Sequence, residues 1–314
     1  MAERILSICI PTFNRAEILR KTVESYVNDP AFDERVEIVI SDNCSSDSTM
    51  EAVSGYLVKH GNIRYNRLPE NIGPELNMSA VLSMGKGLYL KLMNDTAVMK
   101  PGVLKEMLEK LESGISKMEP VFFYQNISFL NSDKTVYCSD LNDLVSNVSF
   151  HITWILNFGI WRKDFESLES KNRLAHLLFP HTDWTLRLVN GKRSAIVHFG
   201  DFYSFAELKN KGGYDLFEVF GVNYLSLLSD YRKQKLLRRK VWNMEKFRLF
   251  RHFLMSWYRT LVLSETKRFD FGRKTPLRSL GKSYRYKPYF YLGILYLYLG
   301  HFLKKKGRQE LVHS

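Results

Sequence analysis

Two kinds of hydrophobic pattern alternate along residues 5–112. Short, mainly apolar runs occupy 5–10, 36–41 and 87–93, and their length and β-branched or aromatic content are typical of buried strands. The more polar segment 62–68 is predicted as a further strand. Apolar residues three or four positions apart follow these runs over 16–27, 49–60, 74–85 and 101–112, and indicate helices. Pro74 and Pro101 suit the first turns of the last two helices. Strands that alternate with helices predict an α/β fold with a doubly wound, mostly parallel sheet.

The pattern becomes mixed after about residue 120. The segments 121–130 and 134–139 are predicted to be antiparallel strands. A helix is expected over 181–190 and a further strand over 194–199.

Polar residues follow three of the four predicted parallel strands. They are Pro11–Arg15 after the first strand, Asp42 and Asn43 after the second, and Asn94 and Asp95 after the fourth. Ligands of doubly wound sheets bind at the carboxyl ends of the strands, so these residues are expected to face one crevice. Neither GxGxxG nor a Walker motif is present, which disfavours a dinucleotide dehydrogenase and an ATPase.

Carboxylates at such strand ends suit a different task. Asp42 can accept a hydrogen bond from the imide N–H of a nucleobase. A carboxylate after the fourth strand can hold a divalent cation, which in turn can neutralise a diphosphate.

Charge divides the chain into two parts. Residues 231–314 hold 22 Lys and Arg against 4 Asp and Glu, whereas residues 1–230 hold 24 against 29. The second part contains a long amphipathic helical pattern over 237–261, with basic residues between its apolar positions, and a Tyr-rich apolar segment over 289–303. We therefore expect a domain over 1–230, followed by a basic helical region over 231–314.

The basic region is predicted to attach to an anionic membrane surface. The 15 apolar residues of 289–303 are fewer than the roughly 20 that a span needs, and basic residues flank both ends. The alternative is a helical domain packed on the catalytic one, with its charges solvated. A sequence pI of about 9.5 also permits nucleic-acid binding, but Tyr and Trp on a strongly apolar segment favour lipid, so no nucleic acid is expected.

Four motifs resemble family 2 glycosyltransferases of the GT-A fold. They are "SICIPTFNR", "EIVISDNCSSDST", "ENIGPELN" and "GKGLYLKLMND", and the most similar group is the bacterial abequosyltransferase-like enzymes, which build surface polysaccharide such as lipopolysaccharide or capsule. The resemblance covers residues 4–112 well and extends weakly to about 200, without the basic tail. It implies a GT-A-like catalytic domain that binds a nucleotide sugar.

The resemblance also assigns roles to residues. Pro11, Thr12 and Asn14 are implied to line the nucleotide pocket, with Arg15 beside them, and Asp42 is implied to contact a uracil- or thymine-like base. Asn71, Gly73 and Asn77 are implied to lie under the sugar nucleotide. Asn94 is also implied to bind the nucleotide sugar. Asp95 is the implied ligand of Mg²⁺ or Mn²⁺. Asp183, in "HTDW", is the implied catalytic general base.

One departure from the family pattern concerns the acidic loop. The family usually carries two or more acids there, whereas Asn94, Asp95, Thr96 and Ala97 contain one. A site with fewer charges binds cations more weakly. Asp95 could hold a metal together with the diphosphate, the protein could work with little help from a metal, or the chain could be catalytically inactive.

The function expected from these observations is transfer of a sugar from a UDP- or dTDP-linked donor. One base without a nucleophile implies a single displacement with inversion at the anomeric carbon. The expected acceptor is a lipid-linked glycan or a polysaccharide. Because the N-terminus shows no secretory leader, we expect a cytoplasmic protein, peripheral at the inner face of the cell membrane. The alternative is a non-catalytic relative that binds a glycan or nucleotide, or acts as a scaffold.

Overall fold

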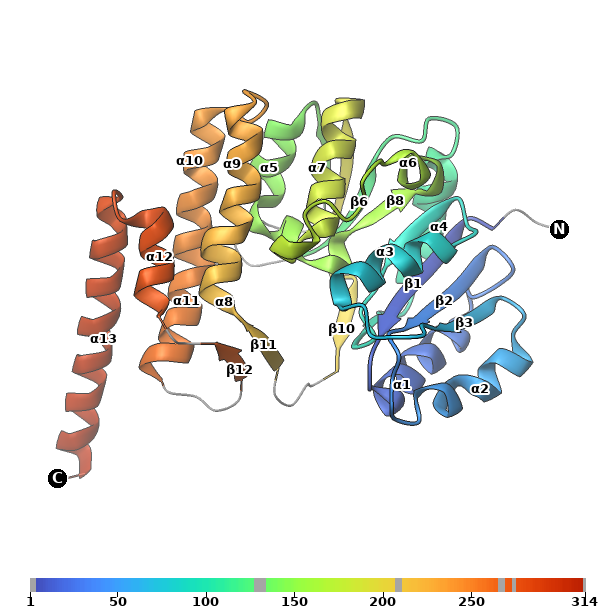
Figure 1. Ribbon diagram of the computed structural model, residues 1–314, viewed down its shortest axis with the longest axis horizontal. Coiled ribbons are helices and arrows are strands. Elements are labelled where there is room, and N and C mark those ends of the chain that lie inside the picture. Colours follow the sequence, from blue (N-terminus) through green and yellow to red (C-terminus); the bar gives the residue numbers. More distant parts are fainter. Residues whose placement is uncertain (1–3, 127–133, 207–210, 265–268, 273–274, 313–314) are drawn as a thin grey trace. The chain divides into compact units, whose positions relative to one another are not determined.

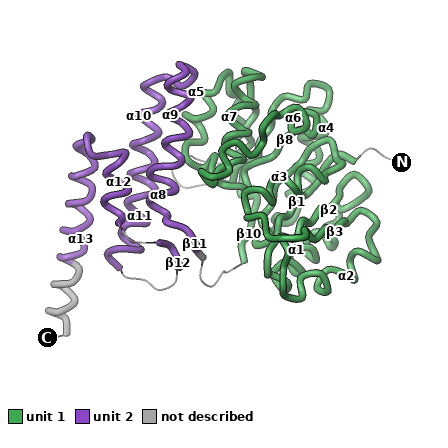
Figure 2. Tube along the Cα trace, viewed as in Figure 1, with its two compact units in different colours: residues 1–207 green, residues 208–314 purple. Residues whose placement is uncertain are grey.

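The computed structural model describes residues 4–126, 134–206, 211–264, 269–272 and 275–312. The chain forms two compact units, residues 1–207 and 208–314 (Figure 2). The boundary predicted from charge, at residue 230, lies later in the chain than the boundary between the two units. Residues 211–230 carry one lysine and three acids, so the start of the second unit is not basic and the change in charge comes after it. The separate functions predicted for the two parts stay a prediction.

A five-stranded sheet forms the centre of the first unit (Figure 1). Its strands are β1 (Leu6–Thr12), β2 (Val36–Asp42), β3 (Ile63–Arg67), β4 (Tyr89–Leu92) and β8 (Gly159–Trp161), in the order β3-β2-β1-β4-β8. The first four run parallel, and β8 pairs antiparallel with β4. The predicted α/β fold with a mostly parallel sheet is confirmed.

Helices cover both faces of this sheet. They are α1 (Ala16–Val27), α2 (Thr49–Lys59), α3 (Pro74–Met84) and α4 (Val103–Gly114). Ile8 and Ile38 belong to one buried cluster with Leu19 of α1, Val53 of α2 and Leu104 of α4. Side chains alternate between the faces of a strand, and α3 contacts β1, β2 and β4, so the other face is covered as well. This is the doubly wound arrangement.

Two smaller sheets complete the first unit. One has the order β6-β9-β7 and is made of β6 (Val121–Gln125), β7 (Lys134–Cys138) and β9 (Ala195–Gly200). The other pairs β5 (Ala97–Met99) with β10 (Tyr203–Phe205). β6 and β7 run in opposite directions, as expected, but they do not pair with each other: β9 lies between them, parallel to β6 and antiparallel to β7. Residues 127–130 of the strand predicted over 121–130 lie outside the described residues.

Further helices connect these sheets. They are α5 (Leu141–Val148), α6 (Arg162–Ser167) and α7 (Pro180–Lys192), with 3₁₀ turns η1 (Ser149–Thr153), η2 (Ile155–Asn157) and η3 (Ala175–Leu177). β6 and β9 can lie parallel because these helices carry the chain back between them.

The second unit is mainly helical. Its elements are β11 (Lys211–Asp215), α8 (Leu216–Glu218), η4 (Val219–Tyr224), α9 (Leu225–Lys233), α10 (Arg239–Arg248), η5 (Leu249–Leu254), α11 (Met255–Tyr258), η6 (Arg259–Leu263), β12 (Phe269–Gly272), α12 (Pro276–Tyr284) and α13 (Pro288–Val312). The run from α10 to η6 is the predicted long helix, with two π-helical stretches. Among the described residues, no helix has both the length and the apolar character needed to cross a bilayer.

The apolar stripe of the α10–η6 helix faces the interior of the second unit. Leu249, Phe250 and Leu254 are fully or almost fully buried, and Phe250 packs against Phe290 of α13 with ring centroids 5.8 Å apart. This stripe is therefore a packing surface inside the second unit. By contrast, α13 buries Phe290 and Leu297 and leaves most of its other apolar side chains exposed.

A lysine is fully buried in the central sheet. Lys91 of β4 has no exposed surface, and its Nζ donates hydrogen bonds to the carbonyl oxygens of Leu156 and, at 3.0 Å, Phe158. These bonds attach η2 and the residue before β8 to β4. Burial lowers the pKa of Lys91 to about 7.

We predict that Lys91 makes stability depend on pH in a defined direction. Between about pH 7 and pH 10 the unfolded chain binds a proton at this lysine that the folded chain lacks, so the free energy of unfolding rises with pH. The variant Lys91→Met lacks this contribution. In urea unfolding from pH 6 to pH 10, the wild type should therefore gain stability relative to the variant above pH 7. A constant difference across that range contradicts the prediction.

Candidate functional site

Three strand ends meet at the carboxyl edge of the central sheet, as predicted. Thr12 is the last residue of β1 and lies opposite Asp42, the last residue of β2. The Thr12 hydroxyl donates a hydrogen bond to Asp95 Oδ2 at 2.9 Å, just beyond β4. Thr12 thus stands between the two acids that the sequence singled out.

Asp95 is buried, with 2% of its side chain exposed, and each of its carboxylate oxygens has a partner. Oδ2 accepts from Thr12, and Oδ1 forms a 2.7 Å ion pair with Nη1 of Arg15. The Asp95 carbonyl oxygen accepts from the hydroxyl of Thr22, on α1, at 2.6 Å. Burial raises the pKa of Asp95, and the charge of Arg15 opposes that rise. The lone acid is therefore anchored to β1 and to the residue that precedes α1.

Asp42 is buried too, with 1% of its surface exposed. Oδ1 accepts hydrogen bonds from the backbone N–H and the hydroxyl of Ser45. Oδ2 accepts from the Tyr65 hydroxyl at 2.5 Å and lies 3.9 Å from Nε of Arg67. Burial first, and then the bond to Asp42, raise the pKa of Tyr65. A nucleobase would have to share Oδ2 with Tyr65 or displace it.

Sequence reasoning missed Ser45, Tyr65 and Arg67. Tyr65 and Arg67 are two residues apart on β3, so they share a face of the strand, and β3 is hydrogen-bonded to β2. That alternation was the available signal, but the segment 62–68 was interpreted only as a strand.

Asn14 joins the loops after β1 and β2. Its backbone adopts φ +52°, its N–H donates to the Ser45 hydroxyl at 2.8 Å, and its Oδ1 accepts from Ser46 N–H at 2.8 Å. Asp47 accepts from the backbone N–H of Ala16 at 3.1 Å and from that of Thr49 at 3.1 Å, so it caps the starts of both α1 and α2. These contacts hold the rim of the crevice.

The predicted floor residues have two different environments. Asn71 Oδ1 accepts from the side chain of Asn43 at 2.8 Å and from Gly73 N–H at 3.0 Å, at a turn where Gly73 has φ +84°. Asn77 is buried, and its side chain accepts a hydrogen bond from the Ser41 hydroxyl at 2.6 Å and donates one to the Ser41 carbonyl at 3.0 Å. Asn77 therefore fixes α3 to β2 and shapes the floor indirectly.

Pro11 and Asn94 lie in the same part of the molecule. Both are half-buried: Pro11 pairs with Ser41 across β1 and β2, and the Asn94 carbonyl accepts from Ala97 N–H at 3.3 Å.

Asp183 lies in the first turn of α7 and has no exposed surface. Arg173 donates to its Oδ2 at 3.1 Å through Nε and to its Oδ1 through Nη2, and Arg187 Nε lies 3.0 Å from Oδ2. Two guanidinium groups therefore occupy the carboxylate that the resemblance implied as the general base. To take a proton from an acceptor hydroxyl, Asp183 would have to release Arg173, which is 44% exposed.

The donor set around Asp95 does not fit a resident divalent cation. Among the described residues, no three His, Cys, Asp or Glu side chains are placed to hold a metal ion. Asn94 and Thr96 add no charge, and both oxygens of Asp95 are already bonded. A divalent cation here would share the single carboxylate with Arg15, and the positive charge of Arg15 would oppose its binding.

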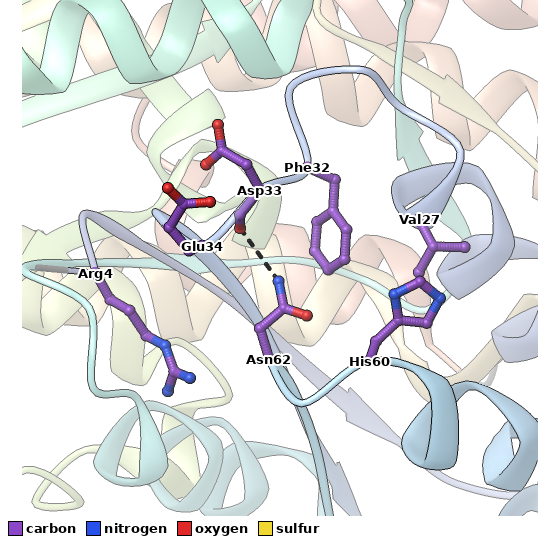
Figure 3. A pocket seen from close by; sticks show the side chains of 7 residues that line it. All are labelled: Arg4, Val27, Phe32, Asp33, Glu34, His60 and Asn62. Carbon is purple, nitrogen blue, oxygen red and sulfur yellow. Dashed lines mark hydrogen bonds between the residues drawn. The ribbon is translucent and has the colours of Figure 1, made fainter. Parts of the chain in front are cut away.

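A pocket of about 430 Å³ lies elsewhere in the first unit (Figure 3). Arg4, which precedes β1, and Asn62, which precedes β3, line it together with Phe32 and Asp33, and Asn62 donates to the Asp33 carbonyl at 3.2 Å. β1 and β3 belong to the parallel part of the sheet, so this pocket is at the amino edge. It is separate from the carboxyl edge of the sheet, where Asp42 and Asp95 lie.

Two bacterial glycosyltransferases are similar to part of the chain. The abequosyltransferase RfbV of Salmonella typhimurium is 38% identical over 86 residues, which is 27% of this chain and 26% of that protein. The GalNAc(5)-diNAcBac-PP-undecaprenol beta-1,3-glucosyltransferase of Campylobacter jejuni is 32% identical over 111 residues, or 35% of each chain. The matched segments thus span about a quarter to a third of these relatives.

Solved structures show the same fold at low sequence identity. The 1–349 fragment of S. aureus TarS, in complex with UDP-GlcNAc, has a TM-score of 0.54 and 15% identity, over 89% of this chain and 79% of that one. The mannosyltransferase PcManGT of Pyrobaculum calidifontis, in complex with GDP-Man and Mn²⁺, has a TM-score of 0.52 and 12% identity, over 96% and 86% of the two chains. The predicted GT-A fold is confirmed by these likenesses.

The family model supplies the assignment. The model described as glycosyl transferase family 2 matches residues 7–176, which include β1 to β4, the crevice residues from Pro11 to Asp95, and β8. The match covers more than half of the chain, and the chain therefore belongs to glycosyl transferase family 2.

Proposed function

We propose that this chain transfers a sugar from a nucleoside diphosphate sugar, UDP- or dTDP-linked, to a lipid-linked glycan or a polysaccharide. The observation that carries the proposal is the position of Thr12 between Asp42 and Asp95 at one sheet edge. In this proposal Asp42 faces the nucleobase of the donor, and Asp95 and Arg15 face its diphosphate. The family membership, and the UDP-GlcNAc bound by TarS on the same fold, support this division of the crevice.

The proposed reaction is a single displacement. An acceptor oxygen forms a bond to the anomeric carbon while the bond from that carbon to the β-phosphate oxygen breaks, and its electron pair leaves with the diphosphate. The acceptor hydroxyl proton passes to a base. One displacement inverts the configuration at the anomeric carbon, through a centre with oxocarbenium character. The leaving diphosphate gains a negative charge, which a cationic group must stabilise.

Replacement of Asp42 tests the proposed contact with the nucleobase. Asp42→Asn keeps the shape but presents an amide where the base N–H needs an acceptor. We predict UDP or dTDP affinity about 10- to 100-fold lower, since a charge-assisted hydrogen bond contributes about 1.5–3 kcal/mol. Calorimetry measures this, with Asp33→Asn at the amino edge as the matched control. Unchanged nucleotide binding by Asp42→Asn refutes the assignment.

Asp183 is proposed as the base that receives the acceptor proton. Its role requires Arg173 to move when the acceptor binds, because both carboxylate oxygens are paired at rest. The proposal therefore couples acceptor binding to the opening of one ion pair.

Asp183→Asn is expected to keep donor affinity and to lower turnover by about 100-fold or more. The readouts are diphosphate release, donor calorimetry and a thermal melt. Glu37→Gln, which removes another buried carboxylate that pairs with two arginines, Arg4 and Arg64, at 3.1 Å each, is the control for loss of a structural ion pair. Normal turnover in a folded Asp183→Asn protein places the base elsewhere, with Asp143, Asp164 and Glu166 as the next candidates.

The acceptor is proposed to lie at an anionic membrane surface, on the inner face of the cell membrane. On α13 the exposed apolar side chains are Tyr291, Leu292, Leu295, Tyr296, Tyr298, Leu299, Phe302 and Leu303. The exposed Arg285 precedes α13 and the basic run 304–308 lies in its C-terminal part. Apolar and Tyr side chains beside positive charge fit the interface of an anionic bilayer, where each Lys or Arg contributes about 1 kcal/mol.

Vesicle co-sedimentation tests this attachment. Leu295→Glu with Leu299→Glu places charge on the exposed face of α13 and should abolish binding to anionic vesicles. The matched control is Val58→Glu, at an apolar residue of α2 that is 88% exposed. Binding should weaken at high salt because the charges are screened. Wild-type protein that ignores anionic vesicles at low salt rules the attachment out.

A non-catalytic role is the second candidate function. The two ion pairs of Asp95 with Arg15 and of Asp183 with Arg173 are the observation that favours it, because they engage both buried acids assigned to the chemistry. Such a protein would bind nucleotide or glycan without releasing diphosphate.

A further inference from the structure

The crevice holds a cation that belongs to the chain itself. We propose that Arg15 binds the diphosphate of the donor and stabilises its charge, and that Asp95 holds the Arg15 guanidinium in position. The inference rests on the proposed function, and it replaces the divalent cation that the sequence predicted at Asp95.

The first argument is the geometry of Asp95. Its Oδ1 contacts Arg15 Nη1 at 2.7 Å and its Oδ2 accepts from Thr12 at 2.9 Å. Thr12 belongs to the central sheet, so it fixes the direction of the carboxylate. A buried carboxylate with a fixed direction restricts where the guanidinium can lie.

The second argument is the exposure of Arg15. The side chain is 43% exposed, whereas its partner Asp95 is 2% exposed. The contact with Asp95 uses one of the five N–H donors of the guanidinium, and the planar group can present a second pair of donors to a phosphate. Arg15 is therefore held on one side and open on the other.

The third argument is the identity of the neighbouring residues. Asp95 is the one acid in the stretch from Asn94 to Ala97, and its charge is already paired with that of Arg15, so a second cation there would gain little attraction from the protein. Arg67 of β3 donates to the Ser45 carbonyl at 2.9 Å and lies 3.9 Å from Asp42 Oδ2. Arg67 therefore lies on the side proposed to bind the nucleobase, whereas Arg15 lies on the side proposed to bind the diphosphate.

The charge balance of the reaction fits this role. When the bond to the anomeric carbon breaks, its electron pair moves to the β-phosphate oxygen, and the diphosphate becomes more negative. Arg15 stays protonated throughout, because an arginine side chain does not lose its proton in proteins. The acceptor proton still goes to the separate base.

Calorimetry of UDP and UMP, each in excess EDTA and in excess Mg²⁺, tests the proposal. UDP differs from UMP by the β-phosphate, so the ratio of their affinities reports that contact. In EDTA the wild type should prefer UDP about tenfold or more, and Arg15→Gln should lose about 10- to 100-fold in UDP affinity with little change for UMP. Arg15→Lys keeps the charge and should retain much of the preference.

Controls separate the contact from general effects. Arg20→Gln on α1 removes an arginine that is 35% exposed and pairs with Glu17 and Glu24, and it should behave as the wild type. Asp95→Asn frees Arg15, so the preference for UDP should fall but remain without Mg²⁺. If Arg15→Gln alone does not fold, the double variant Arg15→Gln with Asp95→Asn leaves no unpaired buried charge and makes the same comparison.

Two results overturn the inference, and they can be told apart. In the first result, the preference for UDP needs Mg²⁺, disappears in Asp95→Asn and survives in Arg15→Gln. A bound metal ion then has the role proposed for Arg15, and the proposed function stays intact. Failure of UDP, dTDP, CDP and GDP to bind under every condition removes the proposed function together with the inference.

Discussion

A buried carboxylate must be paired, and the arrangement of the crevice depends on how Asp95 meets that constraint. It lies at the carboxyl edge of the sheet, next to β4, where solvent would otherwise hydrate it. Thr12 and Arg15 replace the lost water, and Thr22 holds the Asp95 carbonyl at 2.6 Å. These contacts fix the end of β1, the start of α1 and the loop after β4 relative to one another, so the acid that the sequence proposed as a metal ligand also organises the site.

The order of strands and helices could be predicted because their hydrophobic periods are local. The meeting of Asp42 and Asp95 at one edge followed from the parallel sheet. Ion pairs are harder to predict, since Arg15 and Asp95 are 80 positions apart and many other arginines could pair with that acid. Arg187 is a different case, because it lies four residues after Asp183 on the same face of α7, and that spacing could have indicated the pair.

The second unit shows why an amphipathic pattern does not identify what covers it. The stripe over 237–261 predicted one apolar face, and the structure uses that face to pack helices against one another. The segment 289–303 is apolar on all sides, and a helix can bury only part of such a surface against a single neighbouring layer. Phe290 and Leu297 are buried, while Leu295 and Leu299 are 55% and 54% exposed. The surface that we propose to face the membrane therefore belongs to α13, which packs on the α10–η6 helix through Phe290.

The central claim is that the crevice transfers a sugar and does more than bind a nucleotide. Its most direct measurement is diphosphate release from a panel of UDP-, dTDP-, GDP- and CDP-sugars, with lipid-linked glycans supplied in vesicles as acceptors. The account predicts release from UDP- or dTDP-sugars that depends on the acceptor and yields a product with inverted anomeric configuration. Binding of those sugar nucleotides without release, under conditions where the protein is folded and bound to the vesicles, would contradict it.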